Sequence, residues 1–224
     1  MMISFTYFDS QIKFEDDKIP VLIIENKQLF RNVLYSFLNE SQEEYFTFSE
    51  NLKPFEFNKQ GFFISNPIEL DLNNKKLITK INSYLSNAVN NEFLPELSNI
   101  HQSIYDLADK LVAYSSFDLL YENIEIDSSD IVKLLSFKIN CDEQTLTENL
   151  ISFILLLHSY LKINIFVVAN FYVYFSPDEA EQILKTLTLN HINILLIEQS
   201  LPSHISAFES FHILDNDLCE LTNE

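Results

Sequence analysis

The stretch at residues 162–199, KINIFVVANFYVYFSPDEAEQILKTLTLNHINILLIEQ, decides the fold of this protein. Its residues 163–169 form an apolar, β-branched run, which is typical of a strand buried on both faces. The sequence Ser176-Pro177-Asp178-Glu179 then supplies an N-cap, a proline at the first helical position and two acids in the first turn. A second apolar run follows at residues 192–197. A strand, a helix and a strand within so short a span predict a parallel pair, so the fold class is α/β.

The composition of the chain limits its functions. The 224 residues are 47% hydrophobic, which supports a sizeable core, and the formal net charge is −19, from 33 acidic and 14 basic residues. The acids are spread along the whole chain, a pattern that favours solubility over an acidic interaction arm. Neutralising phosphates requires clustered Lys and Arg, so the composition argues against simple nucleic-acid binding.

Cysteine usage and hydropathy indicate the compartment. Cys141 and Cys219 have neither a metal-ligand nor a redox spacing, which indicates a reducing environment. The N-terminal residues carry acids early and lack the apolar stretch of a signal peptide. No apolar run approaches the ~20 residues of a membrane span. We therefore expect a soluble, cytoplasmic protein without a membrane partner.

The chain has one glycine, Gly61, which bears on nucleotide chemistry. Loops that bind phosphates use glycines so that backbone amides reach the ligand. After the predicted strand at residues 21–24 the chain reads ENKQLFR, where a nucleotide hydrolase has its Gly-Lys-Thr loop. Asn170 follows the strand at residues 163–169, where such a fold offers a metal-binding Asp. We expect neither an ATPase nor a dinucleotide-binding enzyme.

Hydrophobic periodicity divides the chain into two predicted domains. Strand patterns at residues 3–8, 11–14, 21–24, 45–48 and 62–65 surround a helix near residues 29–38, and residues 211–214 form a last strand. From residue 75 to residue 161 the pattern is helical only. We predict an α/β head from residues 1–74 and 162–224, with a mixed, largely parallel sheet flanked by helices, and an inserted α-helical leg at residues 75–161. The leg seam of Ile104, Leu107 and Leu111 is either core within the chain or a subunit interface, and the sequence does not decide between them; we expect most of it to be core, with an oligomer contact nearby.

Four stretches, in order along the chain, carry a family resemblance. They are Phe63-Ile64-Ser65-Asn66-Pro67-Ile68-Glu69-Leu70-Asp71-Leu72-Asn73, the acidic segment at residues 123–130, the strand–SPDE–helix–strand unit at residues 166–198 and the closing Ile213-Leu214-Asp215-Asn216-Asp217. Together they resemble the short form of the ring-forming adaptation proteins of type II-A CRISPR systems. The similarity spans nearly the whole chain. Asn66 and Glu69 depart from it, because the family usually has an Asp and a Gly there.

The resemblance implies both a fold and a function. Its members have an α/β head that resembles a P-loop nucleotide hydrolase without the catalytic motifs, and a helical leg. Four subunits close into a calcium-stabilised ring that takes double-stranded DNA ends through its hole, independently of sequence. The ring supports acquisition of new spacers alongside the adaptation integrase and the RNA-guided effector nuclease. Members have no established enzymatic activity.

An acidic stretch at residues 122–130 is the candidate metal site. Calcium takes six to eight oxygen ligands, and acids that alternate around a helix start supply several of them. With the resemblance, the candidate Ca²⁺ ligands are Glu122, Glu125, Asp127 and Asp130. The alternative is that Asp127 or Ser128 is an N-cap and the other acids are a solvated face, since the order of an EF-hand is absent.

The few lysines of the helical segment are the candidate DNA contacts. Lys75, Lys76 and Lys80 form the only basic cluster, and Lys76 and Lys80 share the polar side of a helix. With Lys133 and Lys138, which match lysine positions of the family as Lys80 does, Lys76 and Lys80 are the residues expected to bind DNA. Four copies around one hole would concentrate their positive potential. The alternative is an ordinary solvated helix face.

Two other functions compete with this prediction. The first is a metal-dependent phosphodiesterase or nuclease that uses Glu125, Asp127 and Asp130. The second is a protein-interaction scaffold without nucleic-acid binding. The five histidines are scattered singly and pair with no nucleophile, so no catalytic residue is predicted.

Overall fold

The computed structural model describes residues 1–14, 17–50, 53–122, 126–142 and 144–221. The chain forms two compact units. The first, which we call the sheet unit, comprises Met1–Leu72 and Cys141–Glu224, and the second, the helical unit, comprises Asn73–Asn140. Each unit is described below by itself.

The sheet unit is built on a mixed sheet. In the described part of the chain this sheet has six strands in the order β10-β9-β3-β8-β7-β6. Their bounds are Glu220–Leu221, Glu209–Leu214, Ile19–Ile24, Asn193–Glu198, Ile165–Ala169 and Gly61–Ile64. Four of the five strand pairs are parallel and only the pair of β9 and β10 is antiparallel. The predicted α/β class with a mixed sheet is therefore confirmed.

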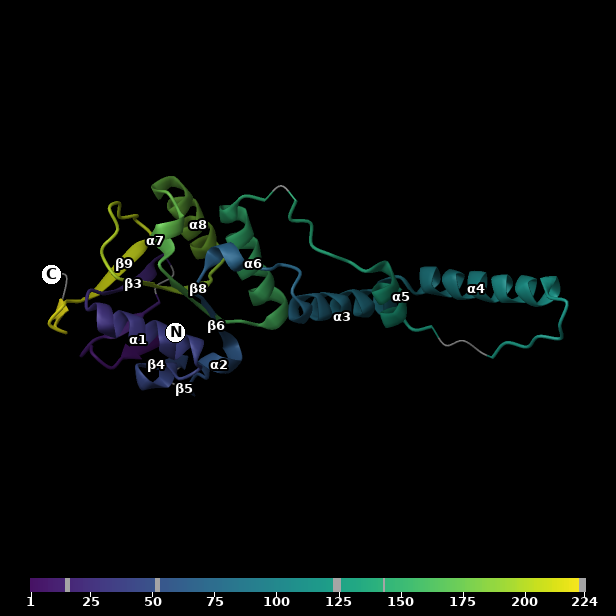
Figure 1. Cartoon of the computed structure of the whole chain (residues 1–224), viewed down its shortest axis with the longest axis horizontal. Coiled ribbons are helices and arrows are strands. Elements are labelled where there is room, and N and C mark those ends of the chain that lie inside the picture. The colour runs from purple at the N-terminus through teal and green to yellow at the C-terminus, as the bar shows by residue number, and fades with distance from the viewer. Residues whose placement is uncertain (15–16, 51–52, 123–125, 143, 222–224) are drawn as a thin grey trace. The chain divides into compact units, whose positions relative to one another are not determined.

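The central strands lie where the sequence predicts them because both of their faces are apolar. Every residue of β3 and β7 is buried, as is all of β8 except its first residue. Figure 1 shows helices on both sides of this sheet. One side has α6 (Leu146–Leu161), α7 (Phe171–Tyr174) and α8 (Pro177–Leu189), and the other has α1 (Lys27–Leu38). At the start of α8, both the backbone N–H and the hydroxyl of Ser176 donate to Glu179 Oε2, so the predicted N-terminus is confirmed.

A second, antiparallel sheet was not predicted. Its order is β2-β1-β4-β5, and its bounds are Gln11–Lys13, Met2–Phe5, Phe46–Glu50 and Lys53–Pro54. The strand patterns at residues 3–8 and 11–14 correspond to β1 and β2, which form a hairpin, and β1 also pairs with β4. The aromatic rings of Phe5, Phe37, Phe46 and Phe57 pack between this sheet, α1 and the main sheet, and Phe37 stacks on Phe63 at 5.0 Å between ring centroids. The remaining short elements are η1 (Gln42–Glu44), α2 (Phe57–Gln60) and η2 (Pro67–Glu69).

The helical unit consists of α3 (Lys75–Glu92), α4 (Leu94–Tyr114) and α5 (Ser128–Leu135). Helix α5 packs on α3, and each helix has a buried apolar residue, Leu77 on α3 and Val132 on α5. The side chain of Asn73 joins the two ends of the unit, since its Nδ2 donates to Ile139 O at 3.0 Å and its Oδ1 accepts from Ile139 N at 2.8 Å. The domain division at residues 75 and 161 stays a prediction, and α6 belongs to the sheet unit in the structure.

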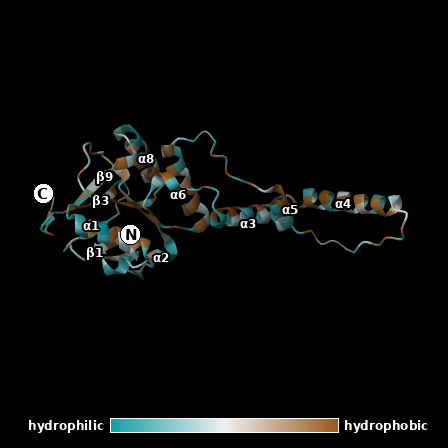
Figure 2. Ribbon diagram, in the orientation of Figure 1, coloured by the Kyte–Doolittle hydropathy of each residue, from teal (hydrophilic) through white to brown (hydrophobic). Residues whose placement is uncertain are grey.

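Helix α4 carries apolar residues that this unit does not cover. Figure 2 shows hydrophobic positions along its length. Leu107 and Leu111 are 56% and 58% exposed, so the expectation that this seam is mostly core is wrong for these two residues. The reason is that α4 has no helix beside it along its C-terminal half in the described part of the unit; Tyr114 and Leu120 beyond them are also exposed.

Candidate functional site

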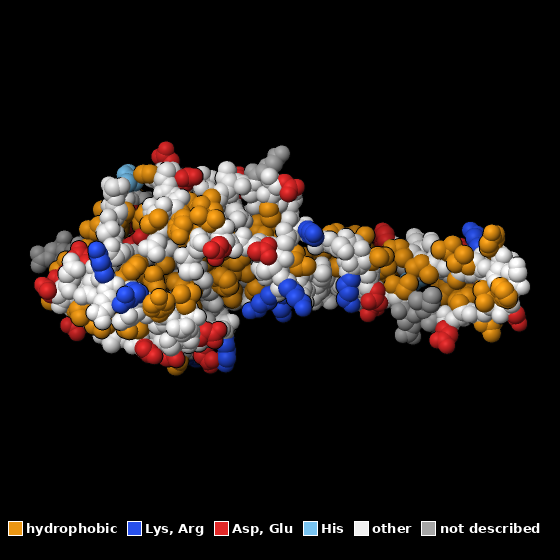
Figure 3. Space-filling view, in the orientation of Figure 1, with side chains coloured by type: hydrophobic (Ala, Val, Ile, Leu, Met, Phe, Trp, Pro, Cys, Tyr) orange, Lys and Arg blue, Asp and Glu red, His pale blue; other side chains and the backbone are white. Residues whose placement is uncertain are grey.

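Helix α3 presents the basic cluster to solvent. Asn74 caps the helix, because its Oδ1 accepts from Leu77 N at 3.0 Å, and Leu77 is fully buried. Lys76 and Lys80 lie a single turn apart on α3, and both are exposed. Lys75 is exposed as well, and Figure 3 shows Lys side chains gathered over α3. Within the described residues, none of the three has an acid within ion-pair distance.

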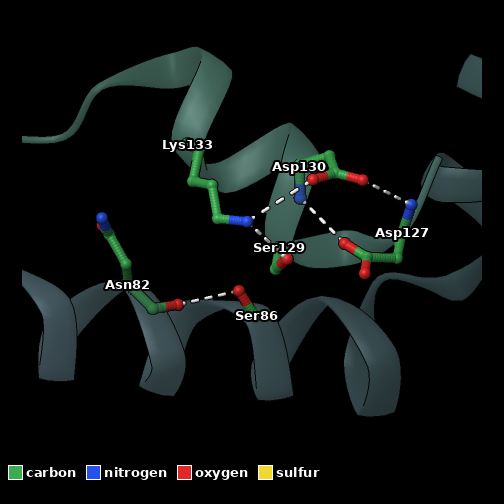
Figure 4. A network of polar contacts seen from close by, with 6 residues as sticks. All are labelled: Asn82, Ser86, Asp127, Ser129, Asp130 and Lys133. Carbon is green, nitrogen blue, oxygen red and sulfur yellow. Dashed lines mark hydrogen bonds and ion pairs between the residues drawn. The ribbon is translucent and has the colours of Figure 1, made fainter.

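Helix α5 brings one further lysine into the same unit. Lys133 is exposed, and its Nζ donates to Ser129 Oγ at 3.1 Å and lies 3.5 Å from Asp130 Oδ1. Figure 4 shows Lys133 above the part of α3 that carries Asn82 and Ser86. Lys138 follows α5 and is exposed too. All four predicted DNA contacts therefore lie in the helical unit, two on α3 and two on or after α5.

The acidic stretch begins α5 with a reciprocal cap. Asp127 Oδ1 accepts from Asp130 N at 2.9 Å, and Asp130 Oδ2 accepts from Asp127 N at 3.3 Å (Figure 4). A hydrogen bond from the Ser129 hydroxyl, followed by the one from the Asp130 amide, lowers the pKa of Asp127 below its usual value. The side chain of Asp127 therefore acts as an N-cap, as the alternative to a metal site predicts.

The remaining predicted metal ligands are not brought together in the described residues. Glu122 is exposed and Glu125 lies outside the described residues. Among the side chains that are described, no three His, Cys, Asp or Glu residues are grouped as a metal site. Both oxygens of Asp130 are engaged, with Lys133 and with the Asp127 amide, and the Asp127 carboxylate accepts from Asp130 N and from the Ser129 hydroxyl. This donor set falls short of the six to eight oxygens that calcium takes.

The pairing of Lys133 with Asp130 connects two residues that were assigned to different sites. Their i, i+3 spacing on one helix is the sequence signal for such a contact. Both side chains are exposed, so the pair is easily opened. The predicted cation site and the predicted metal site are therefore neighbours.

The edge of the main sheet where a nucleotide hydrolase binds phosphate has a different chemistry. Asn26 caps α1, because its Oδ1 accepts from Leu29 N at 3.0 Å, and its Nδ2 donates to Asn216 O at 3.1 Å. The adjacent Glu25 accepts from Asn216 Nδ2 through its carboxylate at 3.3 Å and from Gln199 Nε2 through its carbonyl at 3.2 Å. The side chain of Asn26 thus occupies a backbone N–H at the start of α1 that could otherwise bind a phosphate, and the carboxylate of Glu25 lies beside it.

No helix of the described residues has the length and apolar character needed to cross a membrane.

Comparisons with known proteins point to one family. The sequence model of the CRISPR-associated protein family Cas_Csn2 matches residues 38–218. CRISPR-associated protein Csn2 of Enterococcus faecalis is 24% identical over 209 residues, which cover 89% of this chain and 90% of that protein. CRISPR-associated protein Csn2 of Streptococcus agalactiae is 21% identical over 204 residues, which cover 88% of this chain and 90% of that one. The family match spans most of the chain, which confirms the resemblance to type II-A adaptation proteins: the chain belongs to the Csn2 family of CRISPR-associated proteins.

Proposed function

We propose that this protein assembles into a homotetrameric ring that binds double-stranded DNA ends independently of sequence and supports spacer acquisition in type II-A CRISPR immunity. Membership in the Csn2 family implies a role in CRISPR adaptation. The observation that carries the finer proposal is the group of exposed lysines on α3, none of which has an acid of the described residues within ion-pair distance, in a chain whose net charge is −19.

The proposed DNA contacts are Lys76, Lys80, Lys133 and Lys138. One copy offers too few cations to hold a duplex against its own acids. Four copies arranged around one axis would pool these lysines along a common channel, where their potential adds. Contacts to phosphates alone carry no sequence information, so binding should be independent of sequence and steeply dependent on salt.

The proposed ring is supported by the apolar surface of the helical unit. Leu107, Leu111, Tyr114 and Leu120 are all exposed on or just after α4. Large exposed apolar side chains gathered on one element mark an interaction surface, because their burial against a partner would lower the free energy. In the ring, we propose that a second subunit covers them.

The proposed architecture is an α/β head at residues 1–74 and 162–224 with an inserted α-helical leg at residues 75–161. The strand order β9-β3-β8-β7-β6 places β3, the first strand of this sheet along the chain, between β8 and β9, the last two of its parallel strands, as in P-loop nucleotide hydrolases. The closed start of α1, with Asn26 and Glu25, supports a degenerate form of that fold without phosphate binding and without enzymatic activity.

Calcium is the proposed cofactor, with Glu122, Glu125, Asp127 and Asp130 as its ligands. Asp127 and Asp130 already lie within one hydrogen-bonded turn, which supports a role for both. A bound divalent cation would offset part of the negative charge that opposes both assembly and DNA binding. Waters or a neighbouring subunit would complete the shell. The proposed partners in the cytoplasm are the adaptation integrase and the RNA-guided effector nuclease.

The test combines assembly with DNA binding. Light scattering measures the mass of the protein with and without Ca²⁺, and a gel shift compares linear with circular duplex of the same sequence. We expect a calcium-favoured tetramer that shifts only the linear DNA at low salt. A monomer under both conditions, or no shift of either DNA, would contradict the proposal. Cleavage of the DNA with Mg²⁺ that disappears in Asp127→Asn would favour the phosphodiesterase instead.

A matched pair of variants isolates the lysines of α3. Lys76→Gln/Lys80→Gln removes two charges from the proposed channel. Lys27→Gln/Lys185→Gln removes two from exposed positions of the sheet unit. We expect the first pair to weaken DNA binding. It should also reduce the steepness with which the logarithm of the DNA association constant falls with the logarithm of the salt concentration, by about 2 for each subunit in contact with the DNA. The second pair should change neither the affinity nor this slope. Equal losses in the two would indicate an effect of net charge only.

A further inference from the structure

The sheet unit contains a cavity of about 220 Å³ that the proposed DNA-binding function does not use. Its walls come from α7, α8 and the segment that joins β8 to β9. Phe175, Ala180, Leu184 and Pro202 give it an apolar interior, and the exposed Glu181 lies at its rim. Its volume suits a group of a few non-hydrogen atoms.

Glu209, one of the residues that line this cavity, has a buried carboxylate without a full set of partners. Glu209, the first residue of β9, is only 6% exposed. One oxygen, Oε2, accepts from Ser206 N at 2.6 Å, while Oε1 is buried and has no hydrogen-bond partner among the described residues. A buried, unpaired acid is unfavourable, and accordingly burial raises the pKa of Glu209 to about 7. A group that supplies a proton donor or a positive charge at Oε1 would relieve this.

A second orphan group lines the same cavity. The hydroxyl of Tyr172 on α7 is buried and has no hydrogen-bond partner within the described residues. A buried hydroxyl ordinarily finds a partner, so each unpaired one in a folded protein calls for an explanation. Two such groups on one cavity wall indicate a missing ligand more strongly than either does alone.

The lining residues set the chemistry of that ligand. Among the described residues that line the cavity there is no Lys or Arg, so no fixed positive charge among them neutralises Glu209, and His204 is the one basic side chain of this set. Within the part of the chain that the structure describes, one oxygen of Glu209 lacks a hydrogen-bond partner and the other is engaged, whereas a guanidinium pairs best with both oxygens of a carboxylate. An ammonium needs a single acceptor for each N–H, which Glu209 Oε1 and the Tyr172 hydroxyl oxygen each provide.

We propose that this cavity binds a primary ammonium group on a short apolar stem, with the ammonium at Glu209 Oε1 and Tyr172 and the stem against Phe175 and Leu184. The same chemistry belongs to a free alkylamine and to the side chain of a lysine on a partner protein. The site lies wholly within the sheet unit and is independent of the lysines of α3.

The test uses n-butylammonium as the probe, at pH 8, where the Glu209 carboxylate is mostly ionised. Methyl NMR spectra of the full chain follow the titration. We expect saturable shifts, in the millimolar range because the probe has only five non-hydrogen atoms. Glu209→Gln should weaken binding about 10-fold or more, and Tyr172→Phe by a smaller factor. Butanol and n-butylguanidinium should bind more weakly than n-butylammonium.

The matched control is Glu198→Gln, which alters another buried glutamate whose side chain does not line the cavity. Its affinity for n-butylammonium should equal that of the unmodified protein, and a thermal melt confirms that each variant folds. A short peptide with one central Lys, compared with the same peptide carrying norleucine, identifies the source: tighter binding of the Lys peptide indicates a partner side chain, and binding of the free amine only indicates a small molecule. Absence of saturable shifts, or equal binding by Glu209→Gln, would overturn the proposal and leave a cavity filled by water.

Discussion

Lys133 Nζ lies 3.5 Å from Asp130 Oδ1, so a proposed DNA contact and a proposed calcium ligand form one ion pair on the first turns of α5. Both side chains are more than half exposed, and such a pair contributes only about 0–1 kcal/mol. Binding of a phosphate to Lys133 or of a calcium ion to Asp130 would therefore break this ion pair at a small cost in free energy. Calcium at Asp130 would release Lys133 for DNA, which links the two proposed sites through a single contact.

The ion pair predicts that Asp130→Asn strengthens DNA binding in the absence of calcium. The change frees Lys133 and leaves an amide oxygen to accept from the Asp127 amide, so the helix start is kept. We expect about a 2- to 5-fold gain in affinity for a short duplex, measured by fluorescence anisotropy at low salt. Glu122→Gln removes the same charge from an exposed acid. If it gave the same gain, the effect would be one of net charge and the ion pair would have no special role.

The cap at Asp127 predicts different results for two substitutions. Asn is as good an N-cap as Asp but a weaker ligand for a hard cation. Ala has no side-chain oxygen, so it can neither cap the helix nor bind the cation. We expect Asp127→Asn to leave calcium-free stability nearly unchanged and Asp127→Ala to lower the midpoint of urea unfolding. If Asp127 also binds calcium, both variants should lose the stabilisation that calcium gives. A calcium response retained by Asp127→Asn would restrict Asp127 to capping.

Local sequence patterns predict the parts of this fold that local physics determines. Strand β7 is apolar on both faces, and Ser176 with Glu179 is a recognisable helix start, so both are predictable. The second sheet is not, because the pairing of Ile3 with Phe48 joins residues far apart in the chain and follows from tertiary packing.

The same division applies to the candidate sites. Lys76 and Lys80 are four residues apart, a spacing that places both on one side of a helix, and the pairing of Asp130 with Lys133 follows from their own spacing. The unpaired carboxylate oxygen of Glu209 could not be predicted, because no local sequence pattern indicates that Glu209 is buried or that it lacks a partner among the described residues.

The buried carboxylate of Glu198 predicts that stability falls as the pH rises. Glu198 is 4% exposed at the end of β8, and burial raises its pKa to about 8, although the hydrogen bond from Phe171 N favours the ionised form. The folded state therefore holds a proton that the unfolded state releases above pH 4.5. The contribution of the protonated Glu198 to the free energy of unfolding is fully present below pH 4.5, and it is lost as the pH rises through 8.

Glu198→Gln should remove that pH dependence, since Gln keeps an acceptor for Phe171 N without a charge. We expect the variant to gain stability over the unmodified protein between pH 5 and pH 8, by at most about 5 kcal/mol, in urea unfolding at a series of pH values. The exposed Glu181→Gln serves as the control and should not change the slope. Parallel curves for Glu198→Gln and the unmodified protein would show that Glu198 ionises normally in the fold.

The single glycine, Gly61, predicts a steric effect that does not depend on backbone freedom. Its φ of −106° is accessible to any residue, but a Cβ at this position would overlap the ring of Phe57, which is buried. Gly61→Ala should therefore lower the free energy of unfolding by about 1–3 kcal/mol in urea unfolding, as overpacked substitutions do. Phe57→Leu makes room, so the double variant should be more stable than the sum of the two single effects predicts. Strict additivity would mean that the ring moves aside at no cost, and that Gly61 is required for another reason.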